Sequence, residues 1–164
     1  MFPDATLWTI TLRMIAAVLI GCVIGLDRNL RGKPTGVKTL GLVALGAALV
    51  TMASLGFAVD GMAADDRSAR AIQGIVTGIG FLGAGVILQN GSEGRIRGLT
   101  TAALIWVTAA LGIACGIGAW SVALIATVIV LLLFTVGRKI EHALHRRWLK
   151  RPAHERAADD LNEE

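Results

Sequence analysis

The sequence predicts an all-α membrane protein with five transmembrane helices. Of its 164 residues, 54% are hydrophobic, and the mean hydropathy is +0.66. Soluble domains of this length rarely have such values, because they must also cover a surface that faces water. Five apolar runs are long enough to cross a hydrocarbon core of roughly 30 Å as helices. A soluble helical bundle would need polar faces, whereas the second to fifth runs contain almost no charge.

The five runs are separated mostly by charged loops. They span residues 5–26, 39–59, 71–90, 99–115 and 119–136. The first run ends at the basic segment DRNLRGKPTGVK, the second at the acidic segment DGMAADD, and the third at NGSEGRIRG, after which the fourth begins. Only GIGA separates the fourth run from the fifth, which predicts an antiparallel helical hairpin. We expect its turn to take positive φ angles at Gly116 and Gly118.

The loop charges predict the orientation of the chain. Segment 27–38 has four bases and one acid, segment 90–98 has two bases and one acid, and segment 138–151 has six bases and one acid. Segment 60–70, on the other side, has three acids and two bases. The positive-inside rule therefore places the N-terminus outside and the C-terminus in the cytoplasm. We expect residues 1–137 to form the five-helix transmembrane domain and 138–164 to form a cytoplasmic tail.

The tail is predicted to begin with a basic amphipathic helix. Ile140, Ala143, Leu144 and Trp148 recur at helical spacing on one face. Five basic residues lie elsewhere on the helix: Arg138, Lys139, Arg146, Arg147 and Lys150. This pattern is typical of a helix that lies on an anionic leaflet. The final segment, ERAADDLNEE, is an acidic end that we expect to lie free in solution.

Small residues are concentrated in the third run, within the stretch TGIGFLGAG. Glycine destabilises a helix in water by about 1 kcal/mol relative to alanine, but in a bilayer it lets two helix backbones approach closely. GxxxG pairs occur in the first run (Gly21, Gly25), the third (Gly74, Gly78) and the fourth (Gly112, Gly116), which favours a compact bundle. A helix broken at the glycines around a bound ion is the alternative. Packing is the favoured interpretation.

The fourth run carries a weakly polar stripe of small residues. Its members share one helical face and are Thr101, Thr108, Gly112 and Cys115. We expect this stripe to pack on the third run. A free cysteine in an apolar span usually behaves as a small hydrophobic residue, so neither Cys22 nor Cys115 is expected to form a disulfide or bind a metal.

Charged residues next to the predicted cytoplasmic interface are candidates for recognition. Asp27, Arg28, Lys38 and Arg97 should lie at one depth, where a pair between Asp27 and a base would hold helix ends together. Anchoring by the positive-inside rule is the alternative and carries equal weight for Asp27, Arg28 and Arg97. Anchoring is favoured for Arg31 and Lys33.

Arg13 is the only charged residue inside the five runs. The favoured interpretation places it near the outer interface, with its aliphatic stem along the helix and its guanidinium in water or on lipid phosphate. A buried ion pair with a functional role is the alternative. A helix that begins only at Arg13, after an interfacial lead-in, is left open.

The runs contain little that is suited to ion transport or catalysis. The second to fifth runs offer only Thr, Ser, Gln and Asn as polar side chains, whereas ion carriers usually hold acidic or histidine side chains within the membrane. Asp60, Asp65 and Asp66 are expected to be solvated loop residues rather than a site that gathers cations. No phosphate-binding loop motif is present. We expect no cofactor, no metal site, no catalytic residues and no nucleic-acid partner.

Four segments resemble the membrane domain of the MgtC/SapB family. They are GLDRN at 25–29, GVKT at 36–39, ARAIQGIVTGIGFLGAGVI at 69–87 and RGLTTAALIWVTAALGIACGIG at 97–118. Hydrophobicity alone dictates neither GIGFLGAG nor RGLTTAA followed by a tryptophan. The motif residues that this resemblance marks as functional, for packing or interaction, are Gly78, Gly80, Phe81, Gly83, Gly85, Arg97, Gly98, Thr100, Thr101, Trp106 and Thr108.

The resemblance implies a regulatory protein of the bacterial inner membrane. It implies a link to growth in low magnesium and to survival inside host cells, through modulation of other membrane proteins such as the proton-translocating ATP synthase. A transporter of Mg²⁺ or another ion, or an accessory subunit of one, is the alternative, and a homo-oligomer is left open. Asp27 stands where the family commonly has Glu, and Lys38 where it has Arg. We expect the membrane domain without the soluble C-terminal domain of MgtC-type members.

Overall fold

A computed structural model describes residues 4–33, 35–57, 66–89 and 98–149. These ranges contain five α-helices and no strand: α1 (Asp4–Asn29), α2 (Val37–Ser54), α3 (Asp66–Gln89), α4 (Leu99–Ile117) and α5 (Trp120–Leu149). Each helix is long and apolar enough to cross a membrane. The predicted all-α fold with five candidate spans is therefore confirmed, whereas the sidedness of the termini stays a prediction.

The helices differ from the apolar runs mainly at their ends. α1 continues to Asn29, α3 begins at Asp66, and α5 continues to Leu149. Charged residues end the apolar run but not the helix, because a helix satisfies its own backbone hydrogen bonds in water as well as in lipid. The start of α1 at Asp4 excludes a first helix that begins at Arg13. The predicted tail helix is continuous with α5.

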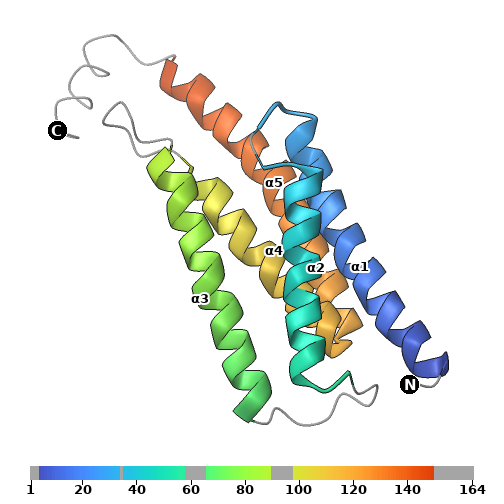
Figure 1. Ribbon diagram of the computed structural model, residues 1–164. Helices are drawn as coiled ribbons and strands as arrows, with labels where there is room; N and C mark the ends of the chain where they lie inside the picture. The colour runs from blue at the N-terminus through green and yellow to red at the C-terminus, as the bar shows by residue number, and fades with distance from the viewer. Residues whose placement is uncertain (1–3, 34, 58–65, 90–97, 150–164) are drawn as a thin grey trace. The chain divides into compact units, whose positions relative to one another are not determined.

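The chain divides into two compact units, residues 1–127 and 128–164. In the first unit, α2 contacts both α1 and α4, and α1 also contacts α4. α3 packs against α4 and, less extensively, α2 (Figure 1). In the second unit, α5 continues from residue 128 to Leu149, and the hydroxyl of Thr135 donates to the carbonyl of Leu131 (2.8 Å).

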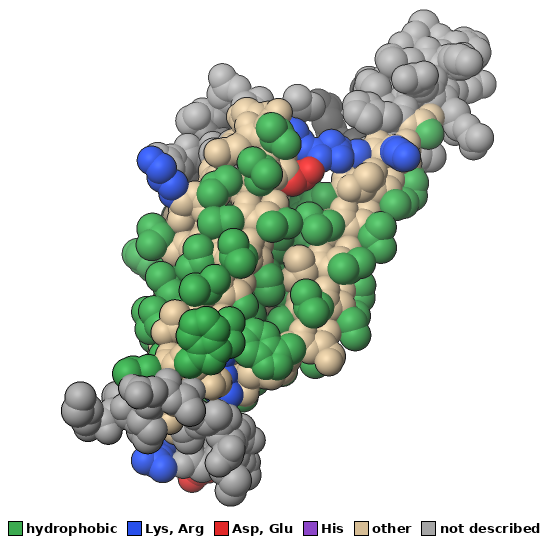
Figure 2. Space-filling model, turned by 90° about the vertical axis from the view of Figure 1, so that its right-hand side faces the viewer, with side chains coloured by type: hydrophobic (Ala, Val, Ile, Leu, Met, Phe, Trp, Pro, Cys, Tyr) green, Lys and Arg blue, Asp and Glu red, His purple; other side chains and the backbone are tan. Residues whose placement is uncertain are grey.

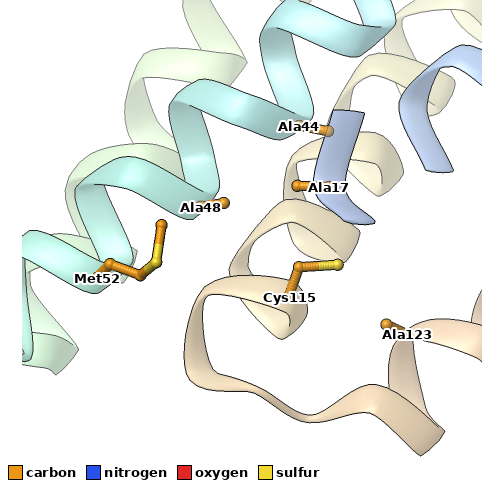
Figure 3. Close-up of a cluster of buried hydrophobic side chains, with 6 residues drawn as sticks. All are labelled: Ala17, Ala44, Ala48, Met52, Cys115 and Ala123. Carbon is orange, nitrogen blue, oxygen red and sulfur yellow. The ribbon is translucent and has the colours of Figure 1, made fainter. Parts of the chain in front are cut away.

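The core of the first unit is made of small side chains. Figure 3 shows this cluster, whose members come from α1, α2, α4 and the first turn of α5: Ala17, Ala44, Ala48, Met52, Cys115 and Ala123. Four of the six are alanine. Helices in lipid gain little from burying large apolar side chains, so association depends on close backbone packing, which small residues allow.

Hydrophobic side chains cover the middle of the described helices on the face drawn in Figure 2, and charged side chains lie toward the helix ends. Many large apolar residues of the described helices are exposed, among them Leu19 on α1 and Leu42 on α2. Such side chains are stable against lipid tails, so this surface fits a protein that is surrounded by a bilayer.

The turn between α4 and α5 is built on Gly118. This residue has a φ of 83°, and the amides of Gly118 and Ala119 donate to the carbonyls of Cys115 (3.0 Å) and Ala114 (2.9 Å). This is the Schellman arrangement that ends a helix. The prediction of a positive φ is confirmed for Gly118 and wrong for Gly116, which is a helical residue of α4 and packs against α2.

Candidate functional site

The glycine pairs of α1 and α4 lie directly against α2. A Cβ on Gly25 would be 2.6 Å from the Cα of Val37, and one on Gly21 would be 2.5 Å from the carbonyl oxygen of Leu40. On α4, a Cβ on Gly116 would be 2.9 Å from the carbonyl oxygen of Ala48, and one on Gly112 would overlap the backbone of Ala44. These contacts leave no room for a side chain, so both pairs are packing surfaces within the chain.

The prediction that the small-residue stripe of α4 packs on α3 was wrong. Thr101, Thr108, Gly112 and Cys115 are all buried, as expected for one packed face. However, Gly112 meets α2, and Thr101 meets α1 through Arg28, so the stripe faces α1 and α2 rather than α3. α2 supplies the complementary alanines at helical spacing, Ala44 and Ala48, and this pattern in α2 was the missed signal.

α3 is a continuous helix through the glycine stretch, from Asp66 to Gln89. The alternative interpretation, in which the helix is broken at the glycines around an ion, is therefore wrong, because the backbone is helical throughout this stretch. A Cβ on Gly74, Gly78, Gly80 or Gly85 would meet no atom of the described chain within 4 Å. The exception is Gly83, which is buried and whose Cβ would be 3.5 Å from that of Ala102 on α4.

The outward face of α3 consists of small residues around one aromatic ring. We define the outward glycine face by Gly74, Gly78, Phe81 and Gly85, which fall near one side of the helix by the 3.6-residue period. The Phe81 side chain is 81% exposed. The face points away from Gly83, the residue that contacts α4. Within the described chain nothing covers the GxxxG pair of α3, unlike the pairs of α1 and α4.

The RGLTTAA motif forms the N-terminal part of α4. Gly98 is the residue before the helix and has a φ of 93°, which favours glycine. Thr100 is exposed, whereas Thr108 is buried and donates its hydroxyl to the carbonyl of Leu104 in its own helix (2.8 Å). Trp106 is 49% exposed on the side of α4 that faces α3. Arg97 lies outside the described residues.

Arg28 connects the ends of α1 and α4. Its side chain is 7% exposed, and its Nη2 donates to the hydroxyl of Thr101 at 2.5 Å. Asp27 forms an ion pair with Arg31 one turn away on the same helix, and the described residues include no ion pair from Asp27 to a base on another helix. Lys38 is exposed at the start of α2. Among Asp27, Arg28 and Lys38, the predicted interface charges that lie in the described part of the chain, Arg28 is the one with a hydrogen bond to another helix.

Arg13 is buried at the other end of the same helix pair. It is 6% exposed, and its Nη1 donates to the carbonyl of Gly116 at 2.9 Å. The guanidinium thus lies at the C-terminus of α4, where carbonyls lack helical donors and a positive charge is favourable. This differs from the expected guanidinium in water or on lipid phosphate. This acceptor could not be identified from the sequence, because it is a backbone carbonyl.

The two arginine contacts define an antiparallel register between α1 and α4. Arg13 and Arg28 are fifteen residues apart on α1, and their acceptors Gly116 and Thr101 are fifteen residues apart on α4. Fifteen helical residues span about 22 Å, somewhat less than a hydrocarbon core of roughly 30 Å. Each guanidinium is therefore close to one edge of the apolar layer, where burying a charge costs less than at its centre.

Metal-ligating side chains do not cluster in the part of the chain that the structure describes. No group of three or more His, Cys, Asp or Glu residues lies together there. Asp66 is exposed at the start of α3, whereas Asp60 and Asp65 fall outside the described residues. Two features of the described residues remain as candidates for an interaction site: the outward glycine face of α3 and the arginine contacts between α1 and α4.

Comparison with known proteins identifies relatives over most of the chain. The model of the MgtC family matches residues 14–143. Protein SrpB of Synechococcus elongatus is 40% identical over 155 residues, which cover 90% of this chain and 84% of SrpB. Protein MgtC of Salmonella typhimurium is 42% identical over 120 residues, and protein MgtC of Brucella abortus is 38% identical over 141 residues. No solved structure matches.

The relatives differ in how much of their own length is matched. The aligned residues cover 73% of this chain but only 48% of the Salmonella protein, and 85% of this chain but 56% of the Brucella protein. The similarity to the proteins named MgtC is therefore a similarity to about half of each, and this half corresponds to the helices described above.

Proposed function

This chain belongs to the MgtC family, and we propose that it regulates other membrane proteins by binding them through the outward glycine face of α3. It is a multi-pass protein of the bacterial inner membrane. The proposed role is adaptation to low magnesium and survival inside host cells, with the ATP synthase as a candidate partner. These assignments rest on the resemblance to proteins named MgtC.

One observation supports the proposal above the others: the same GxxxG motif is used in two ways. The pairs of α1 and α4 are filled by α2, whereas Gly74 and Gly78 of α3 meet nothing in the described chain. An uncovered small-residue face in a bilayer lets a partner helix approach closely and adds van der Waals contacts that lipid tails make less well. A membrane-embedded helix of another protein is thus the proposed ligand.

The proposed orientation has the N-terminus outside and the C-terminus in the cytoplasm. It is supported by the charge asymmetry of the loops. Single cysteines at positions 33 and 65, in a variant that lacks Cys22 and Cys115, test it in intact cells. We expect a membrane-impermeant thiol reagent to label position 65 and to spare position 33. The reverse pattern would invert the orientation.

The regulatory role is tested by growth in low magnesium combined with ion flux. Gly85→Leu adds a bulky side chain to the outward glycine face, so we expect it to abolish the growth phenotype while the protein accumulates normally. Ala53→Leu adds the same side chain at an exposed position of α2 and should leave the phenotype intact. Purified wild-type protein in sealed vesicles should conduct neither Mg²⁺ nor protons.

Two outcomes would contradict the regulatory proposal. Saturable Mg²⁺ uptake by vesicles that contain only this protein would favour a transporter, and that uptake should then fall when Asp65 and Asp66 are changed to Asn. Equal growth in low magnesium with wild type, Gly85→Leu and Ala53→Leu would show that the function does not depend on the outward glycine face. The copurifying proteins lost specifically from Gly85→Leu would identify the partner.

A further inference from the structure

α5 is longer than a membrane span requires. It runs without a break from Trp120 to Leu149, which is 30 residues or about 45 Å of helix (Figure 1). Its candidate span ends at Ile140, so the helical residues 141–149 continue for about 13 Å beyond the span. A headgroup layer is about 5–7 Å thick, and its charge acts over a further Debye length of about 8 Å. The whole C-terminal end of α5 therefore lies within or beside a headgroup layer.

This end of the helix carries a concentrated positive charge. We define the basic end of α5 as residues 138–149, which contain four bases and one acid: Arg138, Lys139, Arg146, Arg147 and Glu141. Lys139 is exposed. Arg138 is half-buried, and its Nε donates to the carbonyl of Phe134 (2.8 Å), one turn toward the apolar layer. This bond uses one of the five N–H donors of the guanidinium and holds the group where the apolar run ends.

Three of the bases lie near one side of the helix. Arg138 and Arg146 are eight residues apart, which places them within about 80° of each other around the axis, and Lys139 falls close to Arg146 in this projection. Ile140 and Ala143, both exposed, lie on the adjoining side. Because these residues continue α5, the helix crosses the headgroup layer instead of lying in its plane, as the sequence pattern alone suggested.

Two kinds of anion are within reach of the basic end of α5. One is the set of phosphates in an anionic leaflet, and the other is segment 155–164, which has five acids and one base. A base beside an anionic membrane surface gains about a fivefold preference. An exposed ion pair between side chains gains at most about fivefold and often nothing measurable, because two flexible side chains must be held in one geometry. The leaflet is therefore the favoured partner.

We propose that the basic end of α5 binds the headgroups of anionic phospholipids of the phosphatidylglycerol class and keeps these lipids next to the protein. Arg138 and Lys139 meet phosphates at the edge of the apolar layer, and guanidinium groups bind phosphate oxygens with charge-assisted hydrogen bonds. The positive charges of Arg146 and Arg147 attract headgroups from the aqueous side. The site is separate from the outward glycine face, so neither proposal depends on the other.

Lipid selectivity around the full chain tests the proposal. The protein is reconstituted in phosphatidylcholine vesicles that contain a trace of spin-labelled phosphatidylglycerol or spin-labelled phosphatidylcholine. Electron paramagnetic resonance then gives the fraction of each labelled lipid that the protein immobilises. We expect a preference of about threefold for phosphatidylglycerol, which disappears at about 1 M salt, where the Debye length is about 3 Å. A preference that is absent, or that salt leaves unchanged, would overturn the proposal.

Two matched variants remove the same amount of charge. The first replaces the four bases of the basic end of α5 by Gln, and its preference for phosphatidylglycerol should disappear. The second replaces four exposed bases elsewhere by Gln and should keep most of the preference: Lys33, Lys38, Arg67 and Arg70. Equal preferences in the wild type and the first variant, or equal losses in the two variants, would contradict the assignment to α5.

Deletion of residues 155–164 distinguishes the leaflet from the acidic segment. If this segment occupied the basic end of α5, its removal would release the bases and raise the preference for phosphatidylglycerol several-fold. We expect the deletion to change the preference by less than about twofold. A preference that appears only in the shortened chain would assign the basic end of α5 to the acidic segment and would also overturn the proposal.

Discussion

The glycine pairs of α4 and α3 have the same spacing but different surroundings. On α4, Gly112 and Gly116 are buried against the backbone of α2, whereas on α3, Gly74 and Gly78 face open space in the described chain. The motif marks a surface that a helix can approach but does not say whether the helix belongs to the same chain. In this protein α2 covers the glycine pair of α1 and, with alanines at the matching positions, the pair of α4, and it leaves the pair of α3 uncovered.

Enlarging a glycine of the covered pairs should have the largest effect on stability. A methyl group at Gly112 overlaps the backbone of Ala44, which cannot move without separating α2 from α4. We expect Gly112→Ala to lower the free energy of unfolding by about 3 kcal/mol, as overpacking does in tight cores. Unfolding by SDS titration in mixed micelles measures it.

The same change at Gly74 is the matched control. A methyl group there meets no described atom within 4 Å, so Gly74→Ala should leave the free energy of unfolding unchanged or raise it by up to about 1 kcal/mol through helix propensity. Equal losses in Gly112→Ala and Gly74→Ala would remove the distinction between covered and uncovered pairs.

The contact between Arg28 and Thr101 should have the next largest effect. Thr101→Val removes the hydroxyl acceptor from a guanidinium that is only 7% exposed, so we expect a loss of about 2 kcal/mol. The double variant Arg28→Met with Thr101→Val should lose less unfolding free energy than the sum of the two single variants. In the double variant both members of the contact are replaced, so neither polar group is left without the other. Lys38→Met, at an exposed position, should change stability by less than about 0.5 kcal/mol. Additive losses would show that the two side chains are not coupled.

The packing around Gly83 is intermediate between that of Gly112, which touches backbone, and that of Gly74, which touches no described atom. A Cβ there would be 3.5 Å from that of Ala102, an ordinary van der Waals distance, so Gly83→Ala should change the free energy of unfolding by less than about 0.5 kcal/mol. Gly83→Leu should cost about 1–3 kcal/mol, because the longer side chain has to push α3 away from α4. A similar loss with alanine and leucine would mean that α3 and α4 are closer than described.

The number and place of the helices followed from the sequence because each span is a continuous apolar run. The Gly118 turn also followed, since a short connection after a helix requires a left-handed residue. The continuation of α3 back to Asp66 did not, because hydropathy locates the apolar layer and not the end of the helix. For the same reason, the end of the apolar run at residue 136 does not mark an end of α5, which continues into the tail as far as Leu149.

The site was predictable in its residue types and not in its contacts. GxxxG spacing marked the pairs in α1, α3 and α4, but the choice of partner depends on α2, whose alanines look ordinary in a hydrophobic run. Arg13 was unusual from its position alone, yet its acceptor is the backbone carbonyl of Gly116, which has no signature in sequence. Equal spacing of the two arginines and their acceptors becomes visible only once α1 and α4 are known to be antiparallel.

The most direct test of the account is the stability of Gly78→Leu. Gly78 is exposed, and a Cβ there would meet no described atom within 4 Å beyond its own helix, so the thermal unfolding midpoint of Gly78→Leu in detergent should equal that of the wild type. Gly112→Ala, measured in the same detergent, should unfold several degrees lower although the added group is much smaller. A fall in the midpoint of Gly78→Leu as large as that of Gly112→Ala would mean that the glycine face of α3 is covered within the chain, and would contradict its assignment as the surface that meets another protein.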